Sequence, residues 1–258
     1  IFALYRAVEA AVQAAADGAD WVDIGGAPFA PGAEIPLEEE FDRVIPVITE
    51  LAAVSDVVIS VDAFRPEVAE AAIEAGASVI NDTTGSHDPT ILDVVAASTA
   101  TLVIAHSLPK PRQPHPLLQY DDVAGEVARF LGERIDRAVA HGVPENRIVI
   151  DPGHDLNKNT FHTLELTRRL KAITSIGIPT IAAVSNKDFI GESLGRERHE
   201  RLEGSLVAAT VSIMFGARII RMHDVPAAVA AARMTETIFG WRQPVFAQHN
   251  LPEREATV

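Results

Sequence analysis

The chain has 258 residues, 47% of them hydrophobic, and a formal charge of −14 at pH 7. This length and apolar content fit one α/β barrel with a single large core. The negative charge argues against a nucleic-acid partner, because phosphate contacts need a basic surface, and no stretch is long and apolar enough to cross a bilayer. The absence of cysteine excludes disulfides, cysteine zinc sites and thiol nucleophiles, and favours a cytoplasmic protein.

Apolar spacing near 3.6 residues predicts eight helices along the chain. They are expected at 2–17, 37–54, 66–75, 89–97, 121–141, 161–175, 201–215 and 226–238. Five glycines stand where a helix turns into a strand, a position that favours a left-handed cap: Gly18, Gly76, Gly142, Gly177 and Gly216. The interleaved charges of 188–205 indicate a solvated helix start, and the tail 241–258 loses periodicity.

Seven short runs rich in Ile and Val alternate with these helices, and each ends in polar or charged residues. The runs are 21–26, 57–62, 78–82, 101–107, 148–150, 179–187 and 217–224. Such runs are typical of parallel strands that are buried on both faces, and their alternation with helices predicts a parallel sheet. We therefore expect a single barrel domain over 1–240, with an eighth strand that should precede the first helix and is not in this sequence.

The chemistry of such a barrel belongs to the rim where the strands end. The polar residues expected there are Asp23, Asp62, Asn81, Asp82, His106, Asp151, Lys187, Arg221 and His223. Each alone is more often a cap or a buried hydrogen-bond partner than a catalyst. Together, the carboxylates and the amide can pair with a nitrogen heterocycle, while Arg221 and His223, two apart on a strand, can hold an anion. No metal cluster stands at ligand spacing, and no Ser-His-Asp order indicates a hydrolase.

Several motifs resemble the dihydropteroate synthase family in order and spacing. They are DIGG (23–26), PG (31–32), SVDAF (60–64), GASVINDTTG (76–85), DPG (151–153), the serine and lysine of SNK (185–187), ERLEGSL (200–206) and RMHDV (221–225). The resemblance covers the chain up to about Ile238. It implies a (βα)8 barrel that joins 6-hydroxymethyl-7,8-dihydropterin diphosphate to 4-aminobenzoate and releases diphosphate.

The resemblance also implies roles for individual residues. Those that would hold the pterin ring are Asp62, Asn81, Asp151 and Lys187, and those that would hold the diphosphate are Arg221 and His223. Lys187, Arg221 and His223 would be the catalytic residues. A Mg2+ ion would be bound through an asparagine on the first strand, and the protein would be a homodimer. Dispersal of negative charge onto the cations would let the C–O bond break before the arylamine attacks.

Three segments depart from the family pattern. Phe29 and Ala30 stand where the family has threonine and arginine, and the segment 154–157 replaces a pattern of aromatic residues and glycines before Lys158. The family's serine-arginine-lysine motif reads Ser185-Asn186-Lys187-Asp188. All three changes surround the second substrate, so the pterin pocket is kept and the aminobenzoate pocket is altered. This pattern resembles the divergent second synthase paralogue of some actinobacteria.

Three functions are therefore open. The first is a synthase that is weak or that uses another nucleophile, with Asp155 and Asp188 opposing a carboxylate unless Lys158 compensates. The second is a non-catalytic pterin-binding paralogue. The third is a methyltetrahydrofolate-binding methyltransferase domain, which the expected diphosphate site at Arg221 and His223 disfavours.

Overall fold

A computed structural model of the chain describes residues 2–28, 32–108, 112 and 119–250. The helices are α1 Phe2–Ala16, α2 Leu37–Val54, α3 Pro66–Ala75, α4 Thr90–Ala96, α5 Val123–Ala140, α6 Thr160–Arg168, α7 Lys171–Thr174, α8 Asp188–Leu194, α9 Leu202–Met214 and α10 Val225–Ile238, with 3-10 turns at Glu145–Arg147 and Arg198–Glu200. The strands are β1 Trp21–Gly25, β2 Val58–Asp62, β3 Val79–Asp82, β4 Thr101–Ala105, β5 Ile148–Asp151, β6 Ile181–Ala182 and β7 Ile219–Ile220. Helices and strands alternate as the sequence predicts.

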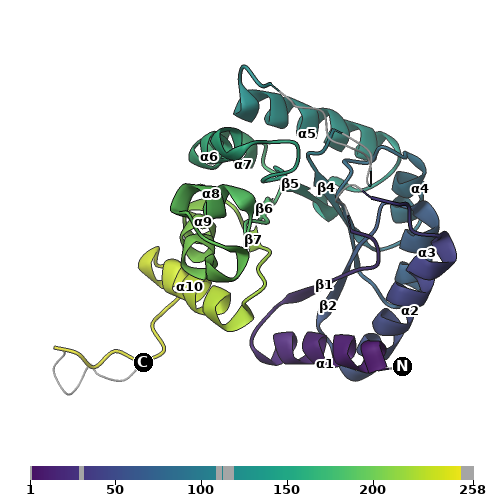
Figure 1. Ribbon diagram of the computed structural model, residues 1–258, viewed down its shortest axis with the longest axis horizontal. Coiled ribbons are helices and arrows are strands. Elements are labelled where there is room, and N and C mark those ends of the chain that lie inside the picture. Colours follow the sequence, from purple (N-terminus) through teal and green to yellow (C-terminus); the bar gives the residue numbers. More distant parts are fainter. Residues whose placement is uncertain (1, 29–31, 109–111, 113–118, 251–258) are drawn as a thin grey trace.

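The strands pair in parallel and in chain order. Strands β1 to β5 form one sheet, β6 and β7 form a second, and a bridge between Ile150 and Thr180 joins the two. The helices lie around the outside of the strands, with α2 to α5 along the first sheet and α9 and α10 beside the second (Figure 1). The prediction of a parallel α/β barrel is confirmed. Within the described residues β1 and β7 are not paired with each other, and the expected eighth strand stays a prediction.

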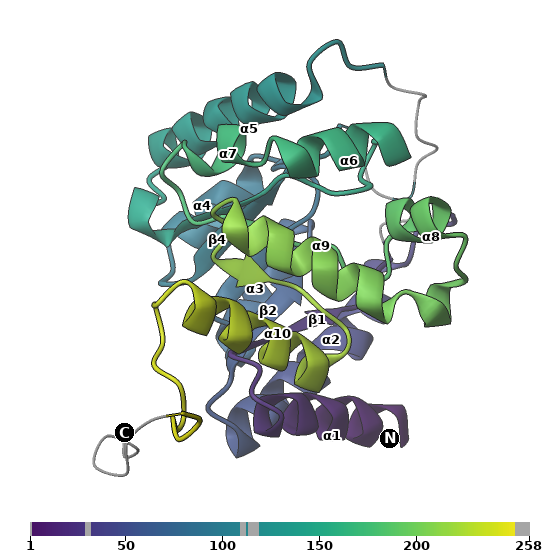
Figure 2. The same ribbon diagram turned by 90° about the vertical axis from the view of Figure 1, so that its left-hand side faces the viewer.

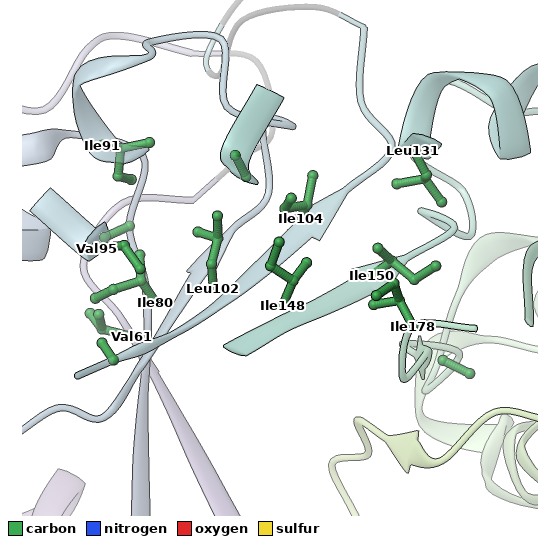
Figure 3. Packing of buried hydrophobic residues seen from close by; sticks show 14 of the residues in the cluster. Val61, Ile80, Ile91, Val95, Leu102, Ile104, Leu131, Ile148, Ile150 and Ile178 are labelled. Carbon is green, nitrogen blue, oxygen red and sulfur yellow. The ribbon is translucent and has the colours of Figure 1, made fainter. Parts of the chain in front are cut away.

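Two layers of apolar side chains line the strands on opposite faces. The larger layer lies between strands and helices, where Ile80, Leu102 and Ile150 are fully buried and face α4 and α5 (Figure 3). The smaller layer contains one residue from each strand: Trp21, Val58, Val79, Val103, Val149, Ile181 and Ile219. Strand side chains alternate between faces, so the next inner-face residue towards the carboxyl end stands two positions further on. On five of the seven strands that residue is polar: Asp23, Ser60, Asn81, Asp151 and Arg221. The inner apolar layer therefore forms a floor beneath the expected site.

The helix ends follow the glycine pattern of the sequence. The five predicted cap glycines all adopt a left-handed backbone: Gly18 φ 100°, Gly76 φ 119°, Gly142 φ 95°, Gly177 φ 97° and Gly216 φ 103°. A residue with a Cβ is strained at these angles, so glycine is the residue that ends each helix and starts the next strand without that strain. Val229 and Arg233 of α10 lie against Gly18, which places the last helix beside the first (Figure 2).

Several element boundaries differ from the sequence prediction. The helix expected at 161–175 is two helices, α6 and α7, because the chain turns at Arg169 and Leu170. The runs 179–187 and 217–224 form strands of only two residues each, since most of each run forms the loop at the barrel rim. The helix α8 was not predicted; left-handed Gly195 ends it, and its contacts with α6 and α9 are tertiary.

The interpretation of 188–205 as a solvated segment holds for residues 192–200, which are all exposed, and Arg201 is an exception to it. Its side chain is only 13% exposed and pairs with Asp188, with Nη1 at 2.9 Å from Oδ1. The tail begins with Trp241, whose ring stacks on Phe239, and the exposed Val245 follows. Of the expected 241–258 extension, residues 251–258 lie outside the described residues. No helix in the described part of the chain is long and apolar enough to span a membrane.

Candidate functional site

Polar residues from neighbouring strands meet at the carboxyl end of the barrel. Asp62 ends β2 and is in register with Asn81 of β3, while Asp151 ends β5 in register with Ala105 of β4. Lys187 directly precedes α8, and Arg221 directly follows β7. Parallel pairing in chain order brings these residues to one edge, as the sequence predicts for a barrel rim.

Asp23 is the centre of the hydrogen-bond network at this edge. Its Oδ1 accepts a bond of 2.6 Å from Oγ of Ser60. Its Oδ2 accepts bonds from Nδ2 of Asn81 at 3.1 Å and from Nε of Arg221 at 2.8 Å. One carboxylate from β1 therefore holds side chains from β2, β3 and the end of β7.

Sequence reasoning placed Asp23 among the strand-end acids but assigned it no role. The DIGG motif contains it, and the strand alternation that puts Trp21 on the inner layer also puts Asp23 on the inner face. That periodicity was the signal that could have found Asp23 and its partner Ser60. The donors themselves come from residues up to 198 positions away, so spacing alone does not reveal them.

Asp62 lies in an environment that favours its protonated form. Burial first, and then the negative charge of Asp23, raise the pKa of Asp62 to about 7, although Arg221 acts in the opposite direction. Thr83 donates a hydrogen bond of 3.2 Å from Oγ1 to Oδ1 of Asp62. A carboxyl group with this pKa can accept or donate a hydrogen bond near neutral pH.

Asp151 is buried beside three cations. The backbone N–H of Gly153 donates to Oδ1 of Asp151 at 2.7 Å. Burial raises the pKa of this carboxyl group, while the Gly153 N–H and the charges of Lys187, Lys158 and Arg221 lower it in part. Asp151 is therefore a buried acceptor next to positive charge.

Arg221 and His223 make different contacts at the end of β7. Burial would lower the pKa of Arg221, but the carboxylates of Asp23 and Asp62 outweigh burial and raise it. His223 contacts Ser185, which follows β6. Its ring Nδ1 lies 2.8 Å from Oγ of Ser185, and its backbone N–H donates to the same oxygen at 3.1 Å. Burial, followed by the positive charge of Arg221, lowers the pKa of His223. Arg221 thus lies towards β1 and His223 towards β6.

Two of the expected rim residues, Asp82 and His106, make their hydrogen bonds with residues of the neighbouring loops. Asp82 alternates with Asn81 along β3, and its carboxylate accepts bonds from the N–H and Oγ1 of Thr84, at 2.9 and 2.6 Å, and from the N–H of Ser86 at 2.8 Å. The interpretation of Asp82 as a pocket acid is wrong for this reason. His106 lies 2.9 Å from Nζ of Lys158, and burial followed by that positive charge lowers the pKa of His106 to about 2.

The charges expected to repel a carboxylate are already engaged. Asp188 pairs with Arg201, and Asp155 accepts bonds from Oγ1 of Thr163 at 3.0 Å and from the N–H of Phe189 at 3.2 Å. Lys158, which the sequence suggests could offset the repulsion by Asp155 and Asp188, is buried. Its Nζ donates to the carbonyl oxygens of Gly153 and Leu156. Burial lowers the pKa of Lys158 to about 7. Phe29 and Ala30 lie outside the described residues.

His154 is a buried histidine whose ring nitrogens have no hydrogen-bond partner among the described residues. The residue is 1% exposed, and neither Nδ1 nor Nε2 has a partner there. The ring stacks on Phe189, with centroids 6.4 Å apart and an interplanar angle of 29°. Burial, followed by the charges of Lys158 and Lys187, lowers the pKa of His154 to about 3. The imidazole is therefore neutral at pH 7.

The described residues contain no group of three or more His, Asp or Glu side chains that could hold a metal ion. The Mg2+ ion that the resemblance implies, with its asparagine ligand on the strand expected before the first helix, stays a prediction.

Comparison with known proteins gives the family. Residues 1–223 match the model of a family described as pterin binding enzyme. Over 243 residues the chain is 41% identical to a Mycobacterium tuberculosis protein named inactive dihydropteroate synthase 2, a match that covers 92% of this chain and 76% of that one. The chain belongs to the dihydropteroate synthase family. The resemblance of the sequence motifs is confirmed.

Relatives that carry the plain name of synthase are similarly close. The Escherichia coli dihydropteroate synthase is 37% identical over 220 residues, with 85% of this chain and 78% of that protein covered. The Xanthomonas albilineans dihydropteroate synthase solved with 4-aminobenzoic acid superimposes with a TM-score of 0.86 at 40% identity, and the match covers 92% of this chain and 85% of that chain. The same enzyme has been solved with 7,8-dihydropteroate. The family thus includes both synthases and proteins named inactive.

Proposed function

We propose that this protein binds 6-hydroxymethyl-7,8-dihydropterin diphosphate at the carboxyl end of its barrel, in folate biosynthesis. The observation that supports this most is the network centred on Asp23. It holds the amide of Asn81 and the guanidinium of Arg221 at 3.1 and 2.8 Å from one carboxylate oxygen. A site whose polar groups are fixed before the ligand arrives binds without the entropic cost of ordering them.

The pterin ring would lie against the buried polar residues above the inner apolar layer. Asp62 and Asp151 would accept bonds from ring N–H groups, while the amide of Asn81 and the ammonium of Lys187 would serve the ring's acceptors. Asp151 is buried, with 7% of its surface exposed, and Asp62 is partly buried. Burial strengthens each such hydrogen bond because competing water is excluded.

The diphosphate would lie towards Arg221 and His223. As the bond between the pterin methylene and the diphosphate oxygen breaks, negative charge develops on the leaving group, and preorganised cations stabilise that charge. The acidic side chains Asp62 and Asp151 would stabilise the positive charge left on the pterin methylene. Mg2+, by resemblance to the family, would accompany the diphosphate, and binding should be measured in its presence.

The arylamine half of the reaction is the part that we expect to be weak. The acceptor would be 4-aminobenzoate, whose nitrogen attacks the methylene. The family's threonine and arginine are Phe29 and Ala30 here, so position 30 supplies no positive charge for the carboxylate. Losing one charged hydrogen bond costs about 1.5–3 kcal/mol, and a displaced nucleophile can lose on the order of a hundredfold in rate.

A non-catalytic pterin-binding paralogue is the second candidate. It is favoured by the 41% identity to mycobacterial proteins that are named inactive. Both candidates predict the same pterin pocket, and they differ only in turnover.

One experiment separates the two. Calorimetry with pterin diphosphate and Mg2+ measures binding, and a coupled diphosphate-release assay with 4-aminobenzoate and other arylamines measures turnover. We expect binding with turnover far below that of the Escherichia coli enzyme assayed in parallel. Turnover at the rate of that enzyme would contradict the loss of the acceptor site, and absence of any pterin binding would contradict both candidates.

We also propose that the protein is a cytoplasmic homodimer that associates through α9 and α10. Side chains on these packed helices are exposed although apolar: Val207 is 64% exposed, Met214 52%, Met234 57% and Ile238 71%. Large apolar side chains exposed on two packed helices favour association. Light scattering should give twice the mass of the chain, and Val207→Glu combined with Met234→Glu should give the monomer.

A further inference from the structure

The loop that follows β5 has an alternating left-handed backbone. Gly153 has φ 68°, Asp155 has φ 63° and Asn157 has φ 56°. Glycine takes such angles without strain, whereas other residues do so at a cost that is smallest for Asn and Asp. Glycine at positions 155 and 157 would adopt the same positive φ without strain. The hydrogen bonds of the Asp155 and Asn157 side chains are therefore the structural reason for having these residues instead of glycine.

Asn157 joins this loop to the segment after β4. Its Oδ1 accepts the backbone N–H of Leu108 at 2.9 Å and lies 3.4 Å from Oγ of Ser107. Its carbonyl oxygen accepts a bond of 3.2 Å from the hydroxyl of Tyr120. A glycine at 157 would keep the bond from Tyr120 and lose the two bonds to the β4 segment.

Asp155 joins the same loop to the segment after β6. Oδ2 accepts the backbone N–H of Phe189 at 3.2 Å, and Oδ1 accepts Oγ1 of Thr163 at 3.0 Å. Phe189 is two residues beyond Lys187, in the first turn of α8. The carboxylate is therefore attached to the peptide segment that carries Lys187.

Arg201 holds that segment from the opposite side. Its Nη1 donates to the carbonyl oxygens of Asn186 at 3.0 Å and Lys187 at 3.1 Å. The segment 186–189 is thus bound both by the guanidinium of Arg201, which directly precedes α9, and by the carboxylate of Asp155.

We propose that Asp155 and Asn157 are positioning residues, which cross-link the loops after β4, β5 and β6 and thereby place Lys187 for ligand binding. This inference rests on the proposed pterin site, in which Lys187 contacts the ligand. Asp155 acts through Lys187, and Asn157 acts on the loop that carries Asp155. The altered residues after β5 therefore contribute rigidity to the pterin half of the site.

A double-mutant cycle between positions 155 and 187 tests the role of Asp155. Asp155→Gly keeps the backbone angle and removes the two side-chain bonds, so we expect about a tenfold loss of affinity for pterin diphosphate. In a Lys187→Met background the same change should have almost no further effect, because the group that it positions is gone. Asn250→Gly, an exposed asparagine with φ 56° far from the site, is the matched control for the glycine itself.

Hydrogen exchange of the free protein provides a readout that does not depend on the ligand. In Asp155→Gly the amide of Phe189 should exchange at least tenfold faster than in the wild-type protein, while the amides of α3 exchange at the same rate. In the control variant Asn250→Gly the amide of Phe189 should exchange at the wild-type rate. In Asn157→Gly the amide of Leu108 should respond in the same way. If Asp155→Gly does not fold, Asp155→Asn, which keeps one acceptor oxygen, is measured instead and should show a smaller change in the same direction.

The outcomes separate the inference from the proposed function. Unchanged exchange at Phe189 in Asp155→Gly would overturn the cross-link, whether or not the protein binds pterin. Equal losses of affinity in the wild-type and Lys187→Met backgrounds would show that Asp155 does not act through Lys187. If exchange changes as expected but the wild-type protein binds no pterin diphosphate, then the cross-link stands and the assigned purpose, together with the proposed function, is wrong.

Discussion

Replacement of the buried histidine by phenylalanine should stabilise the protein. Both ring nitrogens of His154 lack partners, and a buried unsatisfied polar atom costs about 1–3 kcal/mol. Phenylalanine has no such atoms and can stack on Phe189 in the same orientation, although its slightly larger ring recovers less than the full gain because of overpacking. We expect the free energy of unfolding of His154→Phe to rise by about 1–3 kcal/mol at pH 7.5.

The pH dependence of this difference follows from the lowered pKa of His154. Burial, followed by Lys158 and Lys187, brings that pKa to about 3 in the folded protein, against 6.5 for an ordinary histidine. Between these values the unfolded chain binds a proton that the folded protein does not, so wild-type stability falls as pH decreases, by up to about 1.4 kcal/mol per pH unit. Phenylalanine binds no proton. The advantage of the variant should therefore grow by about 2 kcal/mol between pH 7.5 and pH 5.

Urea unfolding followed by circular dichroism at both pH values measures these two quantities. Other titrating groups, including His106, are common to both proteins and cancel in the difference. His249→Phe changes an exposed histidine and should alter neither quantity, which makes it the matched control. Equal stability of His154→Phe and wild type, with parallel pH profiles, would refute the conclusion that the ring is neutral and unpartnered.

Three further predictions concern the charged residues. Asp62→Asn and Asp151→Asn should each weaken pterin binding more than folding, and unchanged affinity in calorimetry would place the site elsewhere. The affinity of the wild-type protein should fall as the pH drops below about 7, where Asp62 gains its proton, and the affinity of Asp62→Asn should show no such step. Arg221→Ala should weaken pterin diphosphate binding by about 1.5–3 kcal/mol and leave the pterin alcohol nearly unaffected; equal losses for both ligands would assign Arg221 a structural role. Arg65→Met should lower the free energy of unfolding by about 3 kcal/mol, because it removes the main counter-ion of the fully buried Glu40, which lies 3.0 Å from Nη1 of Arg65, and leaves only the weaker influence of Arg43. A loss below about 1 kcal/mol in urea titration would contradict this.

The engaged state of Asp155 and Asp188 changes how the altered acceptor region is understood. By sequence, these two carboxylates oppose the carboxylate of an arylamine acid. In the folded chain Arg201 pairs with Asp188, and Thr163 and the N–H of Phe189 satisfy Asp155. We therefore expect weak turnover to follow more from Ala30, which brings no positive charge to the position of the family's arginine, than from repulsion at Asp155 and Asp188.

The amino-acid sequence by itself determined the order of the elements and the edge of the sheet at which the polar residues gather. Ile and Val runs form strands because they bury both faces, and glycines such as Gly76 end helices because φ 119° excludes a Cβ. These are local properties that depend on residues within one turn or one strand. For the same reason the strand-end positions of Asp62, Asn81 and Asp151 could be predicted without any tertiary contact.

Only the tertiary structure decided which of the polar side chains face one another. Side chains alternate between the two faces of β3, so Asp82 lies on the face of the sheet away from Asn81 and from the pocket. The partners of Asp23 and Asp155 lie on other strands and loops, so hydrogen bonds such as that from Arg221 to Asp23 arise only when the sheet is assembled. The short helix α8 depends likewise on Asp155 and Arg201, because a seven-residue helix has too few internal hydrogen bonds to offset its nucleation.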